Sequence, residues 1–228
     1  MPAGNVPPVP ATRTGESYVP ALAHDRLTPL FDPMVRFTTR ERRFKARLLE
    51  QAAIGPRHRV LDIGCGTGTL AIMVKRAEPS ADVAGLDGDP AILERGRAKA
   101  RASGVDVRLD QGMSFDLPYE DASFDRVLSS LFFHHIKPDA KARTAREIAR
   151  VLRPGGELHV ADFGKPIDPL QAASFAVFRR FDGEEETRDN ARGRLPEIFA
   201  AAGLADASLR GTLRTVFGTL AFYSARRA

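Results

Sequence analysis

Short apolar runs alternate with amphipathic stretches over most of this chain, from about residue 40 onward. The short runs predict strands, and stretches whose apolar positions recur three and four residues apart predict helices. The expected strands lie at about 58–63, 82–87, 105–109, 124–129, 157–163, 204–210 and 215–225. The expected helices lie at about 38–53, 69–77, 90–103, 139–152 and 194–202. This alternation predicts an α/β fold built on a doubly wound, mostly parallel sheet.

The two ends of the chain differ in composition. Residues 1–17 are rich in proline and small side chains, so we expect a disordered tail there. Residues 18–228 are expected to form a single domain, and a chain of 228 residues is long enough for a sizeable core. Within that domain, 18–55 is expected to be an N-terminal helical segment, and 164–193 is a long insertion between a strand and a helix.

The first expected helix has a recognisable start and an apolar face. Thr38 and Glu41 have the spacing of a capping box. Phe44 and Leu48 are expected on the inner face of this helix. The same helix carries a dense basic cluster, formed by Arg40, Arg42, Arg43, Lys45 and Arg47.

A glycine-rich turn follows the first expected strand, in the run VLDIGCGTGTL at 60–70. Gly64, Gly66 and Gly68 predict a tight turn, because glycine readily takes a positive φ and lets a ligand approach the backbone. In doubly wound sheets this strand–helix turn holds nucleotide-like cofactors. The dinucleotide fingerprint places its third glycine one residue later, and the nearby carboxylate of Asp62 would repel a pyrophosphate. A ligand that carries a cationic sulfonium and an amino group would tolerate that carboxylate.

The second expected strand, 82–87, ends in a further signal. Asp87 lies about 20 residues past the glycines, where a ribose hydroxyl acceptor is expected. Its carboxylate accepts two hydrogen bonds and so suits vicinal hydroxyls, and Gly88 leaves room for the sugar. Asp89 followed by Pro90 is typical of a helix N-cap and first helical position. We therefore expect Asp87 to hold ribose and Asp89 to cap the helix, with the reverse assignment as the alternative.

The run DIGCGTG at 62–68 resembles the first motif of class I S-adenosylmethionine (SAM) dependent methyltransferases. Segments 122–130 and 149–156 resemble the fourth strand of that family and its turn into the fifth. The resemblance implies SAM as cofactor, S-adenosylhomocysteine as product, and a seven-stranded sheet with a C-terminal antiparallel strand. It implies transfer of a methyl group to a small, partly apolar acceptor. A quinone-like phenol is the first candidate, and other oxygen, carbon or nitrogen nucleophiles are the alternatives. Similarity to the ubiquinone/menaquinone biosynthesis C-methyltransferases rests on DLPY at 116–119, HHI at 134–136 and FDP at 31–33.

The exit of the third expected strand departs from the family pattern. Family members often have an acid after the glycine here, where it meets the adenine amino group. In this chain Met113 follows Gly112. Its thioether can pack on the adenine face, and the backbone of Met113 and Ser114 can read the ring edge. Asp110 or Asp116 can replace the missing acid.

The carboxyl end of the fourth expected strand lies beside the cofactor crevice. By the resemblance, Ser129 and Ser130 are expected near the methionine end of SAM. His134 and His135 follow, and either imidazole can take a proton from a phenol, enol or ammonium. The alternative is that they only brace the loop. Cys65, inside the glycine turn, is expected to be a tolerated small residue rather than a nucleophile. The histidines and acids lack the spacing of metal ligands, so no metal site is expected.

The long insertion carries an aromatic stripe. Phe175, Phe178 and Phe181 lie three residues apart, which places them on one face of a helix. Such a stripe is usually core, but by the resemblance the insertion can instead be a lid that lines an apolar acceptor pocket. The glutamates at 184–186 are expected to form a solvated loop, or to pair with the basic cluster at 40–47.

Composition narrows the possible partners. The net charge of +5 and the pI near 9.7 suggest nucleic acid, but the basic residues of the later helices alternate with acids on solvated faces. The Asn/Asp-Pro-Pro-aromatic run of nucleic-acid amino methylases is absent after the fourth strand. The lack of a signal pattern and the single cysteine fit a cytoplasmic enzyme with a small-molecule substrate. The alternatives are a peripheral membrane phospholipid methyltransferase, whose basic cluster would lie on anionic lipid, and a non-catalytic SAM-binding or scaffold protein. A membrane surface is not the expected partner, and no motif specifies a subunit count.

Overall fold

A computed structural model describes residues 41–228 of the chain, except for the side chain of Phe181. The expected tail at 1–17, the FDP run at 31–33 and the capping residue Thr38 therefore lie outside the described residues. So does the contribution of the Phe181 side chain to the aromatic stripe.

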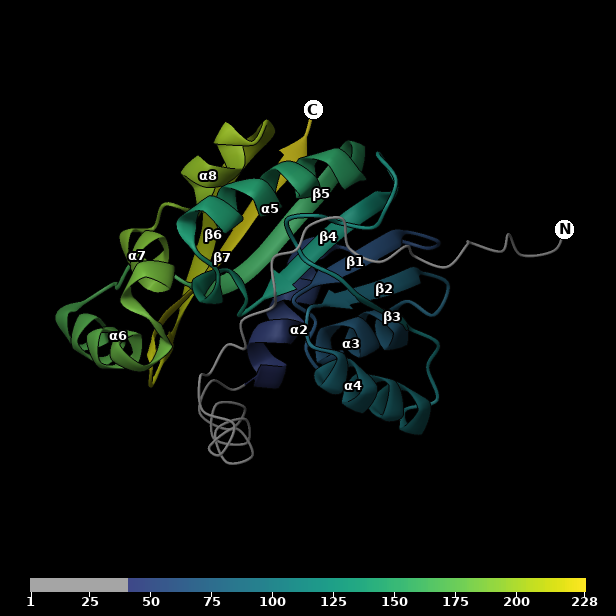
Figure 1. The fold of residues 1–228 in the computed structure, drawn as a ribbon, viewed down its shortest axis with the longest axis horizontal. Coiled ribbons are helices and arrows are strands. Elements are labelled where there is room, and N and C mark those ends of the chain that lie inside the picture. Colours follow the sequence, from purple (N-terminus) through teal and green to yellow (C-terminus); the bar gives the residue numbers. More distant parts are fainter. Residues whose placement is uncertain (1–40) are drawn as a thin grey trace, which may run out of the picture.

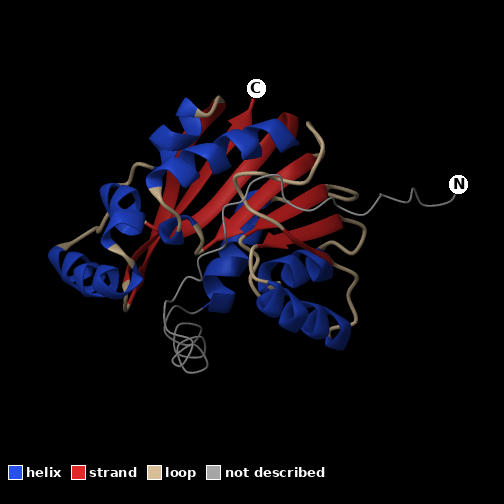
Figure 2. Ribbon diagram, in the orientation of Figure 1, coloured by secondary structure: helices blue, strands red, loops and turns tan. Residues whose placement is uncertain are grey.

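Seven strands form one sheet in the order β3-β2-β1-β4-β5-β7-β6 (Figures 1 and 2). From β3 to β5 all neighbouring strands are parallel, and β7 pairs antiparallel with both β5 and β6. The doubly wound sheet with an antiparallel strand near the C-terminus, expected from the sequence, is confirmed. The strands are β1 (Arg59–Ile63), β2 (Asp82–Asp87), β3 (Arg108–Gln111), β4 (Phe124–Ser130), β5 (Leu152–Phe163), β6 (Leu204–Thr215) and β7 (Gly218–Arg227).

Helices cover both faces of the sheet. Alternate residues of β1 point to opposite faces, as in any strand. Leu61 and Ile63 belong to a buried cluster with α5 and α8, whereas Val60 packs with α2 and α3. The helices are α2 (Glu41–Ala52), α3 (Thr69–Ala77), α4 (Pro90–Ala102), the short 3-10 helix η1 (Phe133–His135), α5 (Pro138–Val151), α6 (Pro169–Asp182), α7 (Glu184–Arg192) and α8 (Leu195–Ala201). Within 41–228, none of these helices is long and apolar enough to cross a membrane.

The amphipathic pattern located the inner face of α2 correctly, since Phe44 and Leu48 are fully buried. The third strand lies a few residues later than expected. It forms only where its backbone is in register with β2, from Arg108 opposite Ala84 to Gln111 opposite Asp87. Pairing with a neighbouring strand, rather than local residue preference, sets its bounds.

The insertion at 164–193 folds into α6 and α7, which pack beyond the ends of β5 and β7 (Figure 1). The expectation of a solvated loop at 184–186 is wrong, because these glutamates form the first turn of α7. Negative charge is favoured there by the partial positive charge of a helix N-terminus. Their pairing with the basic cluster stays a prediction.

Candidate functional site

The glycine turn connects β1 to α3 in the way the sequence predicts. Gly64, Gly66 and Gly68 have φ values of +66°, +53° and +68°. The amides of Gly64 and Cys65 both donate to the carbonyl of Leu86, at 2.9 and 3.1 Å, which joins the turn to the end of β2. A Cβ at Gly64 would lie 2.3 Å from the Phe132 ring, so this glycine is required by packing as well as by φ.

Asp62, just before the turn, has a buried carboxylate. Asp62 is only 1% exposed, and within residues 41–228 neither of its carboxylate oxygens has a hydrogen-bond partner. Burial raises the pKa of Asp62 to about 7, and the Lys45 ammonium offsets only part of this rise. An ionised carboxylate buried in this way is costly to the fold unless a cation or donor joins it. Perturbed, unpaired groups of this kind are typical of binding sites.

Asp87 is held at the glycine turn by the backbone. Its Oδ2 accepts from the Gly66 amide at 2.9 Å, and its Oδ1 accepts from the Asp89 amide at 3.0 Å. A carboxylate offers about four lone-pair sites, so two of them are left for a ligand. The expected N-cap is confirmed: the Asp89 carboxylate accepts from the amides of Ala91 and Ile92, and Pro90 is the first helical residue. The capping role of Asp89 is therefore observed, whereas the ribose contact of Asp87 and the space left by Gly88 stay predictions.

The exit of β3 lies next to this carboxylate. The Gly112 amide donates to the Asp87 carbonyl at 3.0 Å, and the half-buried Met113 follows it. The Ser114 hydroxyl is buried against the Thr144 hydroxyl of α5 at 2.8 Å, so only its backbone is available to read a ring edge.

The two acids proposed to replace the missing adenine contact differ in their surroundings. The Asp110 carboxylate accepts from Tyr119 and from Arg108, both at 2.9 Å. These two bonds engage only Oδ2 of Asp110, and the choice between Asp110 and Asp116 as the replacement acid stays a prediction.

Three other predicted site residues, Ser129, Ser130 and Cys65, differ in their surroundings. The Ser129 hydroxyl is fully buried and donates to the Ile63 carbonyl at 3.0 Å, which ties β4 to β1. Ser130, the last residue of β4, is half-buried at the strand end. The Cys65 thiol is buried, and burial together with the charges of Asp62 and Asp87 raises its pKa well above the ordinary value. A thiol that resists ionisation is a poor nucleophile, which agrees with the expected structural role.

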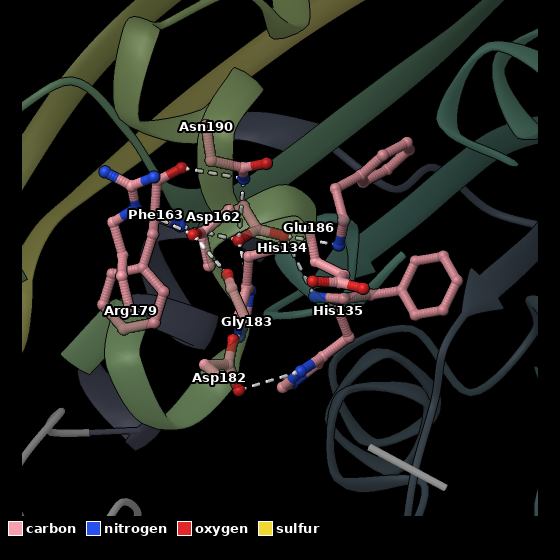
Figure 3. Close-up of polar contacts among 12 residues, drawn as sticks. His134, His135, Asp162, Phe163, Arg179, Asp182, Gly183, Glu186 and Asn190 are labelled. Atoms are coloured by element: carbon pink, nitrogen blue, oxygen red, sulfur yellow. Dashed lines mark hydrogen bonds and ion pairs between the residues drawn. The ribbon is translucent and has the colours of Figure 1, made fainter. Parts of the chain in front are cut away.

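His134 is held by a carboxylate at the end of β5 (Figure 3). Its Nδ1 lies 2.6 Å from Oδ1 of Asp162. The same carboxylate accepts from the amides of Phe132, Phe133 and Phe163, at 3.0, 2.7 and 2.7 Å. These bonds fix the histidine loop on the neighbouring strand.

The last residue of α6, Asp182, faces the same pair of imidazoles. Its Oδ1 lies 3.2 Å from Nδ1 of His135, and its Oδ2 lies 3.6 Å from Nε2 of His134. Burial by itself would lower the pKa of His134, but the charges of Asp162 and Asp182 outweigh it and raise that pKa. The pKa values of both aspartates are lowered, because the histidine charges outweigh the effect of their burial.

Reasoning from the sequence missed both aspartates. Asp162 was visible as an acid in the apolar run of β5, but its partner lies 28 residues away in sequence. Asp182 comes from the insertion, and only the packing of α6 brings it to His134 and His135. One ligand atom of each of these three residues lies within 4.8 Å of the others, a grouping that sequence spacing had not indicated.

Comparison with known proteins agrees with this geometry. The family profile described as "Methyltransferase domain" matches residues 60–156. The chain is 30% identical over 183 residues to a demethylmenaquinone methyltransferase of Symbiobacterium thermophilum, and the match covers 78% of this chain and 71% of that protein. It is 37% identical over 134 residues to the Deinococcus radiodurans protein of the same description, covering 59% of this chain but only 54% of that protein's length. The solved S-adenosylmethionine-dependent methyltransferase SibL, in its apo form, superimposes with a TM-score of 0.70 at 25% identity, covering 90% of this chain and 60% of that one.

The chain therefore belongs to the class I SAM-dependent methyltransferases, an enzyme family. The residues present fit the cofactor of that family. The unpartnered Asp62 carboxylate suits a cationic ligand, and the positive-φ glycines leave the turn without side chains. The Asp87 carboxylate keeps acceptor sites for hydroxyl groups.

Proposed function

We propose that this protein transfers the methyl group of SAM to a small, partly apolar acceptor, with a quinone-like phenol as the first candidate. The observation that carries the proposal is the buried Asp62 carboxylate, which has no hydrogen-bond partner within the described part of the chain and lies directly before three positive-φ glycines. The relatives described as demethylmenaquinone methyltransferases favour the quinone-like acceptor. His134 and His135, together with two aspartates, form a cluster that can take a proton from an acceptor bound beside it.

SAM would lie along the carboxyl ends of β1, β2 and β3. Asp62 would face its positive charge, Asp87 its ribose hydroxyls, and Met113 its adenine ring. The remaining proposed contacts are with Gly64, Cys65, Gly66, Gly68, Gly88, Gly112, the backbone of Ser114, and the β4 residues Ser129 and Ser130. Because the Ser129 hydroxyl is used inside the sheet, Ser130 is the better candidate of the two serines for contact with the methionine end.

Methyl transfer from SAM requires little of the protein beyond positioning of the two reactants. When bound, SAM supplies an electrophilic methyl group on a sulfonium. The protein must hold a nucleophile in line with that methyl in a site from which water is excluded. His134 and His135 lie beyond the carboxyl ends of β4 and β5, and we propose that this pair makes the acceptor reactive by favouring loss of its proton.

The direct test is methyl incorporation from labelled SAM into a panel of phenols, hydroquinones, amines and nucleic acids. We expect incorporation into a hydroquinone or phenol, and strong loss of turnover in His135→Ala with little change in SAM affinity. His159→Ala is a matched control, because that imidazole also contacts a carboxylate, Glu157, but lies outside the site. Incorporation into nucleic acid alone would contradict the proposal, and SAM binding without incorporation into any class would favour a non-catalytic protein.

A further inference from the structure

The histidine–aspartate cluster is buried and rich in negative charge. The side chains of Asp162, His134 and Asp182 are 0%, 3% and 7% exposed, and only His135, at 30%, reaches solvent. With both imidazoles neutral, two carboxylates would leave two negative charges in a site largely cut off from water. Such a site needs a cation, which can be a proton or a metal ion.

The cluster has the donors of a metal site. One nitrogen of each histidine and a carboxylate oxygen of Asp182 lie within 4.8 Å of one another. Asp182 Oδ2 is buried and has no hydrogen-bond partner among residues 41–228, and it lies 3.6 Å from His134 Nε2, too far for a hydrogen bond. A buried carboxylate oxygen that faces an imidazole nitrogen across such a gap is explained by an ion between them.

The surroundings orient these donors. Asp162 holds Nδ1 of His134 at 2.6 Å, which directs Nε2 toward Asp182. Metal-binding histidines usually have their other ring nitrogen fixed by a carboxylate in this way. Asp162 is in turn held by backbone amides and by the Asn190 side chain at 3.3 Å (Figure 3). Contacts with the β-sheet and with α7 therefore hold the His134 side of the donor set in place.

The nearest buried ammonium has its own partners. Lys141 of α5 is fully buried, and its Nζ donates to the Glu186 carbonyl and lies 4.0 Å from Asp189 Oδ2. Its hydrogen bond is directed to α7 rather than into the space between the imidazoles and Asp182, while its charge also acts on Asp162 and His134. That space is left for another cation.

We propose that His134 Nε2, His135 Nδ1 and the Asp182 carboxylate bind a divalent first-row metal ion, with Zn²⁺ as the probe. Two imidazoles and one carboxylate suit such ions, and three protein ligands leave a position for one more donor. This inference rests on the proposed function in one respect only, namely that a methyl acceptor binds next to the metal ion. A bound cation would favour the deprotonated form of that acceptor.

The test is calorimetric titration of the metal-free full chain with Zn²⁺, repeated with Co²⁺ and its visible absorption. We expect one equivalent to bind to the wild type. His135→Ala and Asp182→Ala should each weaken Zn²⁺ binding by roughly 100-fold or more. This exceeds the loss of affinity expected when the replaced residue only orients a metal ligand. Asp162→Asn, which keeps a group beside His134, should weaken it by about 10- to 100-fold. His159→Ala, the buried histidine outside the cluster, should bind as the wild type does.

Two results would overturn the metal site. One is the absence of Zn²⁺ binding to folded wild-type protein; the other is binding that His135→Ala and Asp182→Ala leave unchanged. SAM affinity measured on the same samples separates the two proposals. Protein that binds SAM and methylates an acceptor but does not bind Zn²⁺ would keep the proposed function and assign the imidazoles to proton transfer. Protein that binds Zn²⁺ at the cluster but does not bind SAM would keep the metal site and contradict the proposed function.

Discussion

At the scale of single residues, Asp62 and His134 are buried titratable groups in opposite situations. His134 has two carboxylates as partners, so its charged form is favoured and its pKa is raised. The burial of Asp62 outweighs the opposing charge of Lys45, so its charged form is disfavoured and its pKa is raised to about 7. The first arrangement stabilises the fold, whereas the second is explained by a ligand.

Replacing Asp62 by Asn tests that explanation through pH. The folded-state pKa of about 7 exceeds the ordinary value of 3.8, so ionisation of Asp62 opposes folding progressively between these values. Asp62→Asn removes this effect. Relative to the wild type, the variant should gain roughly 1–3 kcal/mol in free energy of unfolding between pH 5 and pH 8.

Urea unfolding at the two pH values measures this difference, and SAM affinity should fall in the same variant. Equal effects at pH 5 and pH 8 would show that Asp62 is not a buried, unpartnered carboxylate in solution.

Residue-scale prediction succeeded where the cause is local. The positive φ of Gly64 and the capping by Asp89 follow from short motifs, and both are observed. The partners of His134 were not predictable in that way. Asp162 and Asp182 are brought to it by strand order and by the packing of α6, neither of which leaves a local signal.

At the scale of elements, α6 joins the insertion to the sheet. Phe175 and Phe178 are 1% and 8% exposed, and they form a buried cluster with Phe163. The Phe178 ring centroid lies 4.7 Å from that of Phe163 and 6.0 Å from that of His134. These contacts favour the core interpretation of the stripe over the lid, while leaving Phe178 next to the proposed acceptor site.

Phe178→Ala should therefore act mainly on stability. Loss of a buried phenylalanine costs about 3–5 kcal/mol, so the melting temperature should fall clearly. SAM affinity of the folded variant should change little, because the proposed cofactor contacts come from β1 to β4. Val177→Ala, on the same helix but 61% exposed, is the control and should change stability by less than about 0.5 kcal/mol. A stable Phe178→Ala protein with a raised acceptor KM would instead favour the lid.

Element boundaries were predictable where hydrophobic periodicity and capping agree, as in α4, and where the glycine turn sets the start of the helix, as in α3. The α7 helix was missed because its first turn is three glutamates, which indicate a solvated loop by composition. Its buried side is polar: Thr187, Asp189 and Asn190 are buried, so apolar periodicity could not show it.

At the scale of the whole molecule, the topology assembles the site. The parallel strands β3, β2, β1, β4 and β5 end at one edge of the sheet (Figure 1). The glycine turn follows β1, Asp87 ends β2, and the histidine loop follows β4. The alternating pattern predicted this arrangement, because the carboxyl ends of parallel strands form the ligand crevice in open α/β sheets.

The central claim, that the glycine turn binds SAM, is tested most directly by calorimetry with SAM, S-adenosylhomocysteine and NAD. We predict that SAM and S-adenosylhomocysteine bind in the micromolar range and that NAD does not. Asp87→Ala should weaken SAM binding by about 1.5–3 kcal/mol, through lost hydrogen bonds to a charged group. The control Asp89→Ala should lose about 1 kcal/mol of stability as a removed helix cap and still bind SAM. Binding of NAD without SAM would contradict the account, and loss of SAM binding only in Asp89→Ala would show that the roles of the two acids are exchanged.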